Sequence, residues 1–242
     1  MPWWNLLINF ILPPRCIKCG KILSEHNGLC HDCFSKIQFI SAPYCACCGR
    51  PFFNESGLTF GKKQLCGQCL QQKKHLFVMQ RSSFIYDDES KNLILDFKFK
   101  DKTVYAETLA GMLFTAGHDI WLQKPDVIIP VPIHALRLLH RRYNQSALLA
   151  KNLALKTNIP VDYLSLVRRQ NTIPQVKLSG EARRRNLKKA FCVDNPKNIK
   201  GKNIVLIDDV ETTGSTLNEC AKVLKQAGAN KIYALTLART EI

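Results

Sequence analysis

Four C-x-x-C pairs near the start of the chain constrain its fold more than any other feature. Nine of the eleven cysteines lie within the first 69 residues, and eight of them form two sets with the spacings C-x2-C-x10-C-x2-C and C-x2-C-x17-C-x2-C. Two such pairs present the four thiolates of a closed, structural zinc site. Short cysteine-rich units bury little apolar surface and need a covalent or metal cross-link of this kind. The expected ligands are Cys16, Cys19, Cys30 and Cys33 in the first set and Cys45, Cys48, Cys66 and Cys69 in the second.

The two sets are predicted to be an internal repeat of one small unit. The segment "RCIKCGK" is echoed by "YCACCGRP", and each is followed by a second C-x-x-C pair. Gly20 and Gly49 directly follow the first pair of their unit, where such a turn often needs a left-handed residue. Because each unit looks self-contained, we expect the pairs to combine sequentially; interleaved pairing stays open.

Three cysteines fall outside the two sets. Cys47 could replace its neighbour Cys48 as a ligand, but the x2 spacing favours Cys48. Cys192 and Cys220 are isolated and are expected to be plain core residues. The histidines near the cysteine sets are expected to be bystanders rather than ligands; they are His26, His31 and His75.

The opening segment "MPWWNLLINFILPP" bears on the compartment. It lacks the basic stretch and the small-residue cleavage site of an export signal, and its apolar run is too short to span a bilayer. Paired cysteines without an export signal favour metal binding over disulfides. A cytoplasmic protein is therefore expected. The tryptophan-rich start is expected to cap a neighbouring domain, with peripheral membrane association as the alternative.

Beyond the cysteine-rich part, strand and helix patterns alternate. Short apolar runs at 82–86, 126–132, 202–209 and 231–239 predict strands, and 3.6-residue apolar spacing at 89–99, 105–117, 144–157 and 215–229 predicts helices. Such alternation is typical of an α/β fold, with a parallel sheet and helices on both faces. We expect two domains, residues 1–80 with the cysteine sets and residues 81–242 with the sheet.

The segment "IVLIDDVETTGST" (204–216) carries the clearest site motif. Asp208 and Asp209 end a buried strand, and ligands of open parallel sheets bind at the carboxyl ends of the strands. Two carboxylates there, expected to be exposed, suit adjacent sugar hydroxyls or a hydrated Mg²⁺. The hydroxyls and backbone N–H groups that follow form an anion nest at a helix N-terminus. The nest comprises Thr212, Thr213, Gly214, Ser215 and Thr216. Together the two carboxylates and this nest predict a site for a ribose 5-phosphate.

Positive charge is concentrated in one stretch. The chain has 35 Lys and Arg against 19 Asp and Glu, a net charge of +16, and residues 134–203 alone contain 16 against 3, or +13. This asymmetry predicts an anionic partner. If the partner is a nucleic acid, the basic stretch could bind its phosphate backbone while Tyr143 or Phe191 stacks on the bases. Lys98, Lys100 and Lys102 could extend such a groove, whereas Phe97 and Phe99 are expected in the core.

The Asp-Asp and Thr-Thr-Gly-Ser-Thr segment resembles the signature of the type I phosphoribosyltransferases, which bind phosphoribosyl pyrophosphate (PRPP) with Mg²⁺. The resemblance implies that Asp208 and Asp209 hold the ribose hydroxyls and that 212–216 holds the 5-phosphate. It also implies a pyrophosphate loop at Val131 and Pro132. A mobile lid is implied at 168–186; its arginines, or those before Tyr143, would contact pyrophosphate or DNA. These are Arg141, Arg142, Arg168, Arg169, Arg183 and Arg184.

Together with the cysteine-rich front, the segments "DVIIPVPIH", "RRYNQSALLAKNLA" and "RRQNTIPQVKLSGEARRRNLKKAF" resemble the ComF family of competence proteins over nearly the whole chain. The resemblance implies a double zinc ribbon before a phosphoribosyltransferase-like, Rossmann-type sheet. It further implies a protein that binds PRPP with Mg²⁺ and single-stranded DNA during DNA import, beside other import or processing proteins. One departure is Arg142, which stands where the family usually has glycine.

Three functions remain open from the sequence. The first is this competence factor, with phosphoribosyl transfer to an unknown acceptor undecided. The second is a nucleobase-salvage phosphoribosyltransferase, which needs a base pocket near the last strand, where Tyr233 is the main candidate. The third is a non-catalytic adaptor that senses PRPP. No residue stands out as a catalytic acid or base, and phosphoribosyl transfer relies mainly on positioning and charge.

Overall fold

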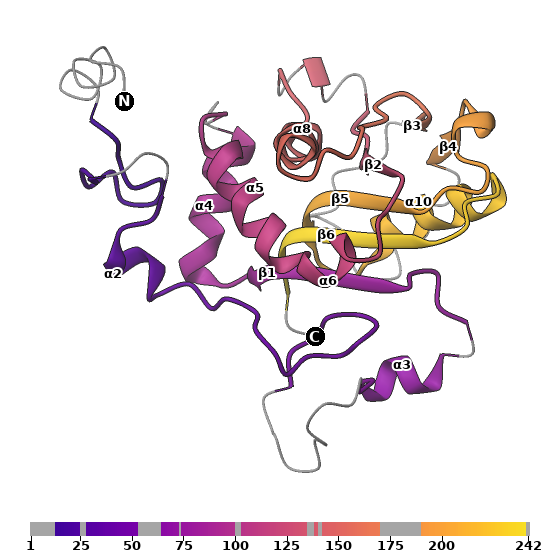
Figure 1. Ribbon diagram of the computed structural model, residues 1–242. Coiled ribbons are helices and arrows are strands. Elements are labelled where there is room, and N and C mark those ends of the chain that lie inside the picture. The colour runs from indigo at the N-terminus through magenta and orange to yellow at the C-terminus, as the bar shows by residue number, and fades with distance from the viewer. Residues whose placement is uncertain are drawn as a thin grey trace.

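The protein is described by a computed structural model covering residues 13–24, 28–52, 64–72, 74–99, 103–134, 138–139, 142–169 and 190–240. Its centre is a sheet of four parallel strands in the order β1-β6-β5-β2 (Figure 1). The strands are β1 (Met79–Ile85), β2 (Val127–Pro130), β5 (Ile204–Glu211) and β6 (Ile232–Arg239). The register places Pro130 beside Ile207 and Asp208 beside Thr236. The parallel sheet predicted from the sequence is therefore confirmed.

Two cores cover the two faces of the sheet. On one face α4 (Asp88–Phe99), α5 (Tyr105–Ala116), α6 (His118–Trp121) and α8 (Gln145–Thr157) pack against alternate strand residues such as Val205 and Tyr233. On the other face α10 (Ser215–Gln226) packs against the intervening residues, among them Leu206. Burial on both faces explains the continuous apolar runs of β2 and β5.

The helix boundaries follow local sequence signals. The side chain of Asn144 caps α8 by accepting a hydrogen bond from the Ser146 backbone N–H, and Asn158 ends the helix with a left-handed φ of 57°. Gly117 ends α5, as its position predicts. The sequence patterns did not predict the short antiparallel pair of β3 (Leu166–Arg168) and β4 (Phe191–Val193).

The two cysteine units fold alike, as the repeat predicts. In each, the backbone N–H of the glycine after the first pair donates to the carbonyl of the first cysteine at 2.9 Å, and the third cysteine's N–H donates to the first thiolate sulfur at 3.3 Å. Both glycines are left-handed, with φ of 77° at Gly20 and 69° at Gly49. Short helices follow, α2 (His31–Phe34) and α3 (Gly67–Gln71).

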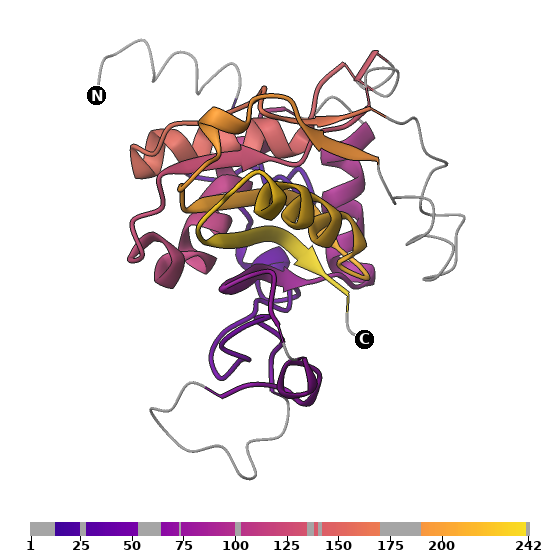
Figure 2. The same ribbon diagram turned by 90° about the vertical axis from the view of Figure 1, so that its right-hand side faces the viewer.

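The cysteine-rich segment runs along the outer edge of β1. Backbone hydrogen bonds link Ile40 to Ser83, Ile85 to Gln38 and Gln80 to Cys47, so the edge strand is paired rather than open. Figure 2 shows the second unit and α3 projecting from the sheet on this side. Of the helices in the described part of the chain, none has the length and apolar character that a bilayer crossing requires.

Candidate functional site

Asp208 and Asp209 lie at the carboxyl end of β5, where the sequence places them. The Asp208 Oδ1 atom accepts hydrogen bonds from the Ser146 hydroxyl at 3.1 Å and from the Asp209 backbone N–H at 2.9 Å. The Asp209 Oδ1 atom lies 2.9 Å from the Lys98 ammonium, and its side chain is 14% exposed. The expectation that both carboxylates are exposed is therefore wrong. The ends of α4 and α8 reach over this strand end and cover them.

The two adjacent carboxylates affect each other's charge. Burial, and after it the negative charge of Asp209, raise the pKa of Asp208 to about 7. The hydrogen bond from the Asp209 N–H, the Lys98 ammonium and the Ser146 hydroxyl all oppose this rise. A carboxyl group held near neutrality in this way favours the approach of a cation or of hydroxyl donors, which would stabilise its ionised form.

The loop after β5 leads directly into α10, as its sequence predicts. Gly214 precedes the helix with a left-handed φ of 68°, which a residue with a side chain would adopt only with strain. The Thr213 and Ser215 hydroxyls are 2.7 Å apart, and Ser215 begins the helix. A small hollow at this helix N-terminus is lined by Asp208, Gly214, Ser215 and Thr216 among others. Such a terminus favours an anion, because its backbone N–H groups lack partners within the helix.

The segment after β2 lies next to this strand end. The Val131 N–H donates to the Ile207 carbonyl at 2.9 Å, and the Asn144 side-chain amide donates to the Val131 carbonyl at 3.0 Å. Val131 is buried, whereas Pro132 is half-buried. Asn144 therefore ties the start of α8 to the end of β2, beside the pair of aspartates.

The arginines expected to contact pyrophosphate or DNA lie in different surroundings. Arg142, at the position where glycine is usual, adopts a left-handed φ of 64° and is exposed. Arg168 stacks over the Phe191 ring at 5.3 Å, and Arg169 pairs with Asp194 at 2.7 Å. Arg141, Arg183 and Arg184 lie outside the described residues, as does most of the expected lid at 168–186.

The aromatic residues considered for base stacking are largely unavailable. Phe191 is buried in the core below α10, so its proposed stacking role is wrong. The Tyr143 hydroxyl donates to the Phe97 carbonyl at 2.7 Å, and Phe97 is buried as expected. Phe99 is 60% exposed and does not join the core. Lys98 pairs with Asp209 rather than extending an outer groove, while Lys100 and Lys102 lie outside the described residues.

Two functional contacts escaped the sequence interpretation. Ser146 lies in the first turn of α8, and only its position beside a capping asparagine marked it. Lys98 was expected to extend a groove for nucleic acid, and nothing in its sequence surroundings indicated a contact with Asp209. Both contacts join segments far apart in the chain, so they depend on the packing of α4 and α8 over the sheet.

The eight paired cysteines gather into two clusters of four. One comprises Cys16, Cys19, Cys30 and Cys33, and the other Cys45, Cys48, Cys66 and Cys69; within each cluster all ligand atoms lie within 4.8 Å of one another. This is sequential pairing, with Cys48 rather than Cys47 in the second cluster. Four converging thiols are the donor set of a structural zinc site, so the geometry fits two bound zinc ions.

The remaining cysteines differ in their surroundings. The Cys47 sulfur lies 3.4 Å from the His75 Nδ1 atom and 3.8 Å from the Phe77 carbonyl oxygen, and burial raises the pKa of its thiol. Cys47, Cys69 and His75 form a third close group. Cys220 is a core residue as expected, but Cys192 is half-buried and its thiol donates to Asp194, so its assignment to the core is wrong.

Two domain models match this chain, one for each part of the structure. A double zinc ribbon domain matches residues 7–72, and a phosphoribosyl transferase domain matches residues 122–241. Among solved structures, the orotate phosphoribosyltransferase from Aeropyrum pernix is 24% identical, with a TM-score of 0.36 over 65% of this chain and 68% of that one.

Several relatives match along almost their whole length. Competence protein F of Haemophilus influenzae is 38% identical over 232 residues, which cover 93% of this chain and 96% of that protein. The DNA utilization protein YhgH of Escherichia coli is 33% identical over 95% of this chain and 98% of that protein. Competence protein ComFC of Bacillus subtilis is 28% identical over 90% and 87%. Given this identity over full-length relatives and the order of the two domains, the chain belongs to the ComF family of competence proteins, with a double zinc ribbon before a phosphoribosyltransferase domain.

Proposed function

We propose that the protein acts in DNA uptake or utilization, binds PRPP with Mg²⁺ at the end of β5, and handles single-stranded DNA. The observation that carries the PRPP site is the adjacency of β2 and β5. Their parallel pairing brings Asp208, the loop at 212–216 and Val131 to one edge of the sheet. The names of the relatives, competence protein F and DNA utilization protein, support the role in DNA uptake or utilization.

In this proposal each group at the strand end has a definite task. Asp208 and Asp209 accept hydrogen bonds from the ribose hydroxyls, and the N–H groups and hydroxyls of 212–216 hold the 5-phosphate. Val131 and Pro132 lie against the pyrophosphate. Mg²⁺ prefers carboxylate and phosphate oxygens, and the two aspartates are the carboxylates at hand, so the donor set fits this ion. When bound, the ion would supply positive charge to the pyrophosphate oxygens.

Lys98 and Ser146 position the two carboxylates. Lys98 neutralises Asp209, and Ser146 keeps Asp208 turned toward α8. A ligand with two hydroxyls or a cation would take over these contacts at little reorganisation cost, since the carboxylates are already fixed. Whether a phosphoribosyl group is then transferred depends on an acceptor that the proposed site does not itself specify.

The salvage alternative is less well supported. Its main candidate for a base pocket was Tyr233, and that side chain is fully buried in the core beneath α5. A non-catalytic PRPP sensor uses the same binding residues and differs only in turnover. We also propose the domain division at residues 80 and 81, which lies two residues into β1 and close to the point where the cysteine-rich segment gives way to the sheet.

The test measures PRPP binding and turnover separately. Isothermal titration of the zinc-loaded protein with PRPP and Mg²⁺ is expected to give saturable binding, which Asp208→Ala with Asp209→Ala abolishes. Unchanged affinity in this double variant would overturn the proposed ribose site. Pyrophosphate release is then followed with free nucleobases and with single-stranded DNA as acceptors. Release with nucleobases alone supports the salvage enzyme, release with DNA supports transfer in the proposed pathway, and binding without release supports a sensor.

A further inference from the structure

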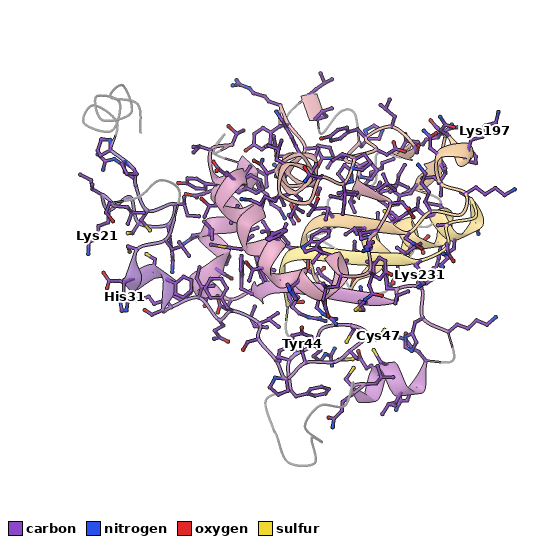
Figure 3. The ribbon with its side chains drawn as sticks, in the orientation of Figure 1. Lys21, His31, Tyr44, Cys47, Lys197 and Lys231 are labelled. Atoms are coloured by element: carbon purple, nitrogen blue, oxygen red, sulfur yellow. The ribbon has the colours of Figure 1, made fainter. Side chains whose placement is uncertain are left out.

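A second hollow lies behind the phosphate loop, between the two domains. This hollow, here called the ribbon cleft, has a volume of about 530 Å³. Its walls come from the second cysteine unit and the segment after it on one side, and from 211–215 and α10 on the other. In Figure 3, Cys47 lies between the sheet and α3, where the second unit faces the sheet. A hollow of this size falls in the range of small-molecule binding sites.

Positive charge surrounds the ribbon cleft. Arg50, Lys74, Lys222 and Arg239 line it, and the acidic residues that line it are Glu211 and Glu219. Glu219 is paired with Lys222 at 2.6 Å. Glu211 lies in the interior, where burial raises its pKa and the charges of Arg239 and Arg50 oppose the rise. A zinc-bound cluster of four thiolates is net negative and offsets the buried positive charge of Arg239. The exposed ammonium groups of Lys74 and Lys222 are therefore the groups that favour a ligand carrying an anion.

Amide side chains line the ribbon cleft beside thiols and apolar residues. Gln68, Gln72, Gln80 and Asn218 contribute them, and each amide offers both donors and an acceptor. The Gln80 amide nitrogen lies 3.5 Å from the Glu211 Oε1 atom, a weak contact that a ligand could replace. Leu76 and Phe77 form a single apolar wall. Exposed cations, amides and the Phe77 ring in one hollow match a phosphate, the hydrogen-bonding edge of a base and the face of its ring.

Two arginine side chains make hydrogen bonds in the walls of the ribbon cleft. The Arg239 guanidinium is buried and donates to the Cys48 carbonyl, and the Arg50 guanidinium donates to Gln68 at 3.1 Å. The cluster of four cysteines therefore fixes one wall. On the other wall, Glu211, Thr212, Gly214 and Ser215 also line the small hollow beside Asp208. A ligand in the ribbon cleft thus touches the same loop that faces the proposed 5-phosphate site.

We propose that the ribbon cleft binds a nucleotide, with its phosphate at Lys74 and Lys222 and its base against Gln80 and Asn218. The nucleotide is either a free mononucleotide or one unit of single-stranded DNA, because both present a phosphate and a base edge. The assignment to single-stranded DNA rests on the proposed function, whereas the assignment to a free mononucleotide does not. Binding there also provides a direct contact between the zinc ribbon and the phosphate loop.

The test compares matched pairs of exposed lysines in the zinc-loaded full chain. Lys74→Ala with Lys222→Ala removes two charges from the ribbon cleft. Lys197→Ala with Lys231→Ala removes two charges from residues that do not line the ribbon cleft, one in the 3-10 helix Pro196–Asn198 and one directly before β6; both are labelled in Figure 3. The probes are a labelled oligodeoxythymidylate, followed by fluorescence anisotropy, and dAMP and dTMP, followed by isothermal titration.

We expect at least a tenfold loss of affinity from the cleft variant and less than a twofold loss from the control variant. Gln72→Trp, which narrows the ribbon cleft without changing charge, is expected to weaken binding as well. Saturable binding of dAMP or dTMP assigns the site to a mononucleotide, and binding of the oligonucleotide alone assigns it to DNA. Equal losses from the two lysine pairs, or no binding of any probe, would overturn the proposal.

PRPP titration of the same wild-type sample separates this proposal from the proposed function. Nucleotide binding without PRPP binding leaves the ribbon cleft standing and rejects the PRPP site. PRPP binding without nucleotide or oligonucleotide binding supports the PRPP site and rejects the ribbon cleft as a nucleotide site. Zinc content is measured for every variant, so that loss of the ribbon itself is recognised.

Discussion

The ammonium of Lys98 lies 2.9 Å from the carboxylate of Asp209, at the point where α4 ends over the carboxyl end of β5. Both side chains are mostly buried, at 20% and 14% exposure. The pair neutralises one of two adjacent carboxylates, and Asp208 accepts hydrogen bonds from the Ser146 hydroxyl and the Asp209 backbone N–H. The stability of this strand end therefore depends on one lysine from a distant helix.

Lys98→Gln is expected to destabilise the fold. Removal of the cation leaves Asp209 partly buried beside Asp208 without its ion-pair partner, which costs on the order of 1–2 kcal/mol at a partly buried site and lowers Tm by roughly 2–8 °C. The loss should be larger at pH 8 than at pH 6, because Asp208 is then ionised and repels Asp209. Thermal unfolding at both pH values measures the effect.

Lys91→Gln is the matched control for this change. Lys91 lies on the same helix but is exposed. Its substitution should move Tm by less than about 1 °C, since exposed charges contribute little to stability. Equal shifts for the two variants would show that the Lys98 contact with Asp209 is not stabilising.

Asp208→Asn is expected to stabilise the protein while it removes the proposed ribose contact. The folded-state pKa of Asp208 is raised to about 7, above its ordinary value of 3.8. Between these two values the folded protein holds a proton that the unfolded chain has lost, so stability falls as pH rises from about 4 to 7. An asparagine side chain does not titrate in this range. The difference in Tm between the variant and the wild type should therefore grow from about pH 4 to pH 7 and level off above pH 7.

Melting curves of wild type and Asp208→Asn between pH 4 and pH 8 check the sign. A Tm difference that stays constant over this range would contradict the raised pKa. PRPP titration of the same variant provides a second measurement, and weaker binding together with higher stability is the expected combination. Weaker binding together with higher stability is common when a substitution removes an electrostatically unfavourable group from a binding site.

Much of the fold could be predicted because its signals are local. The runs that became β2, β5 and β6 are apolar on both faces, and the helices between them carry 3.6-residue spacing and recognisable ends. The short β3 and β4 strands escaped, because three residues in a basic stretch carry too little periodicity to be recognised. Their pairing is set by packing against α10 rather than by their own sequence.

The candidate site divides in the same way. The positions of Asp208, Gly214 and Ser215 followed from the motif, because a strand end and a helix start fix them locally. Burial of the aspartates did not follow, since it depends on Lys98 and Ser146 from distant helices. The ribbon cleft likewise depends on how the second cysteine unit docks on β1, which no short sequence pattern encodes.

Gly49→Ala is expected to be far more damaging than Gly20→Ala. Both glycines are left-handed, so each substitution carries a backbone cost of about 1 kcal/mol or more. At Gly49 an added Cβ would lie 2.3 Å from the Gln80 carbonyl oxygen, whereas at Gly20 it would meet nothing within 4 Å. Only Gly49→Ala must therefore push the second cysteine unit away from β1.

Limited proteolysis and zinc content distinguish the two glycine variants. Gly49→Ala should expose the segment between the second unit and β1 to cleavage and lower Tm by several degrees more than Gly20→Ala. Both variants should retain zinc, because neither glycine supplies a ligand. Equal proteolysis of the two would argue against tight docking at Gln80.

Cys47→Ser and Cys48→Ser test the ligand assignment where two adjacent thiols compete. Cys48 belongs to the second cluster of four, while the Cys47 thiol contacts His75 and Phe77 instead. Cys48→Ser should therefore reduce the zinc content from two ions to one per chain and unfold the wall of the ribbon cleft, because a serine hydroxyl replaces a thiolate ligand. Cys47→Ser should keep both ions. Metal analysis of the purified variants decides the matter, and the reverse result would make Cys47 the ligand and leave Cys48 the spare thiol.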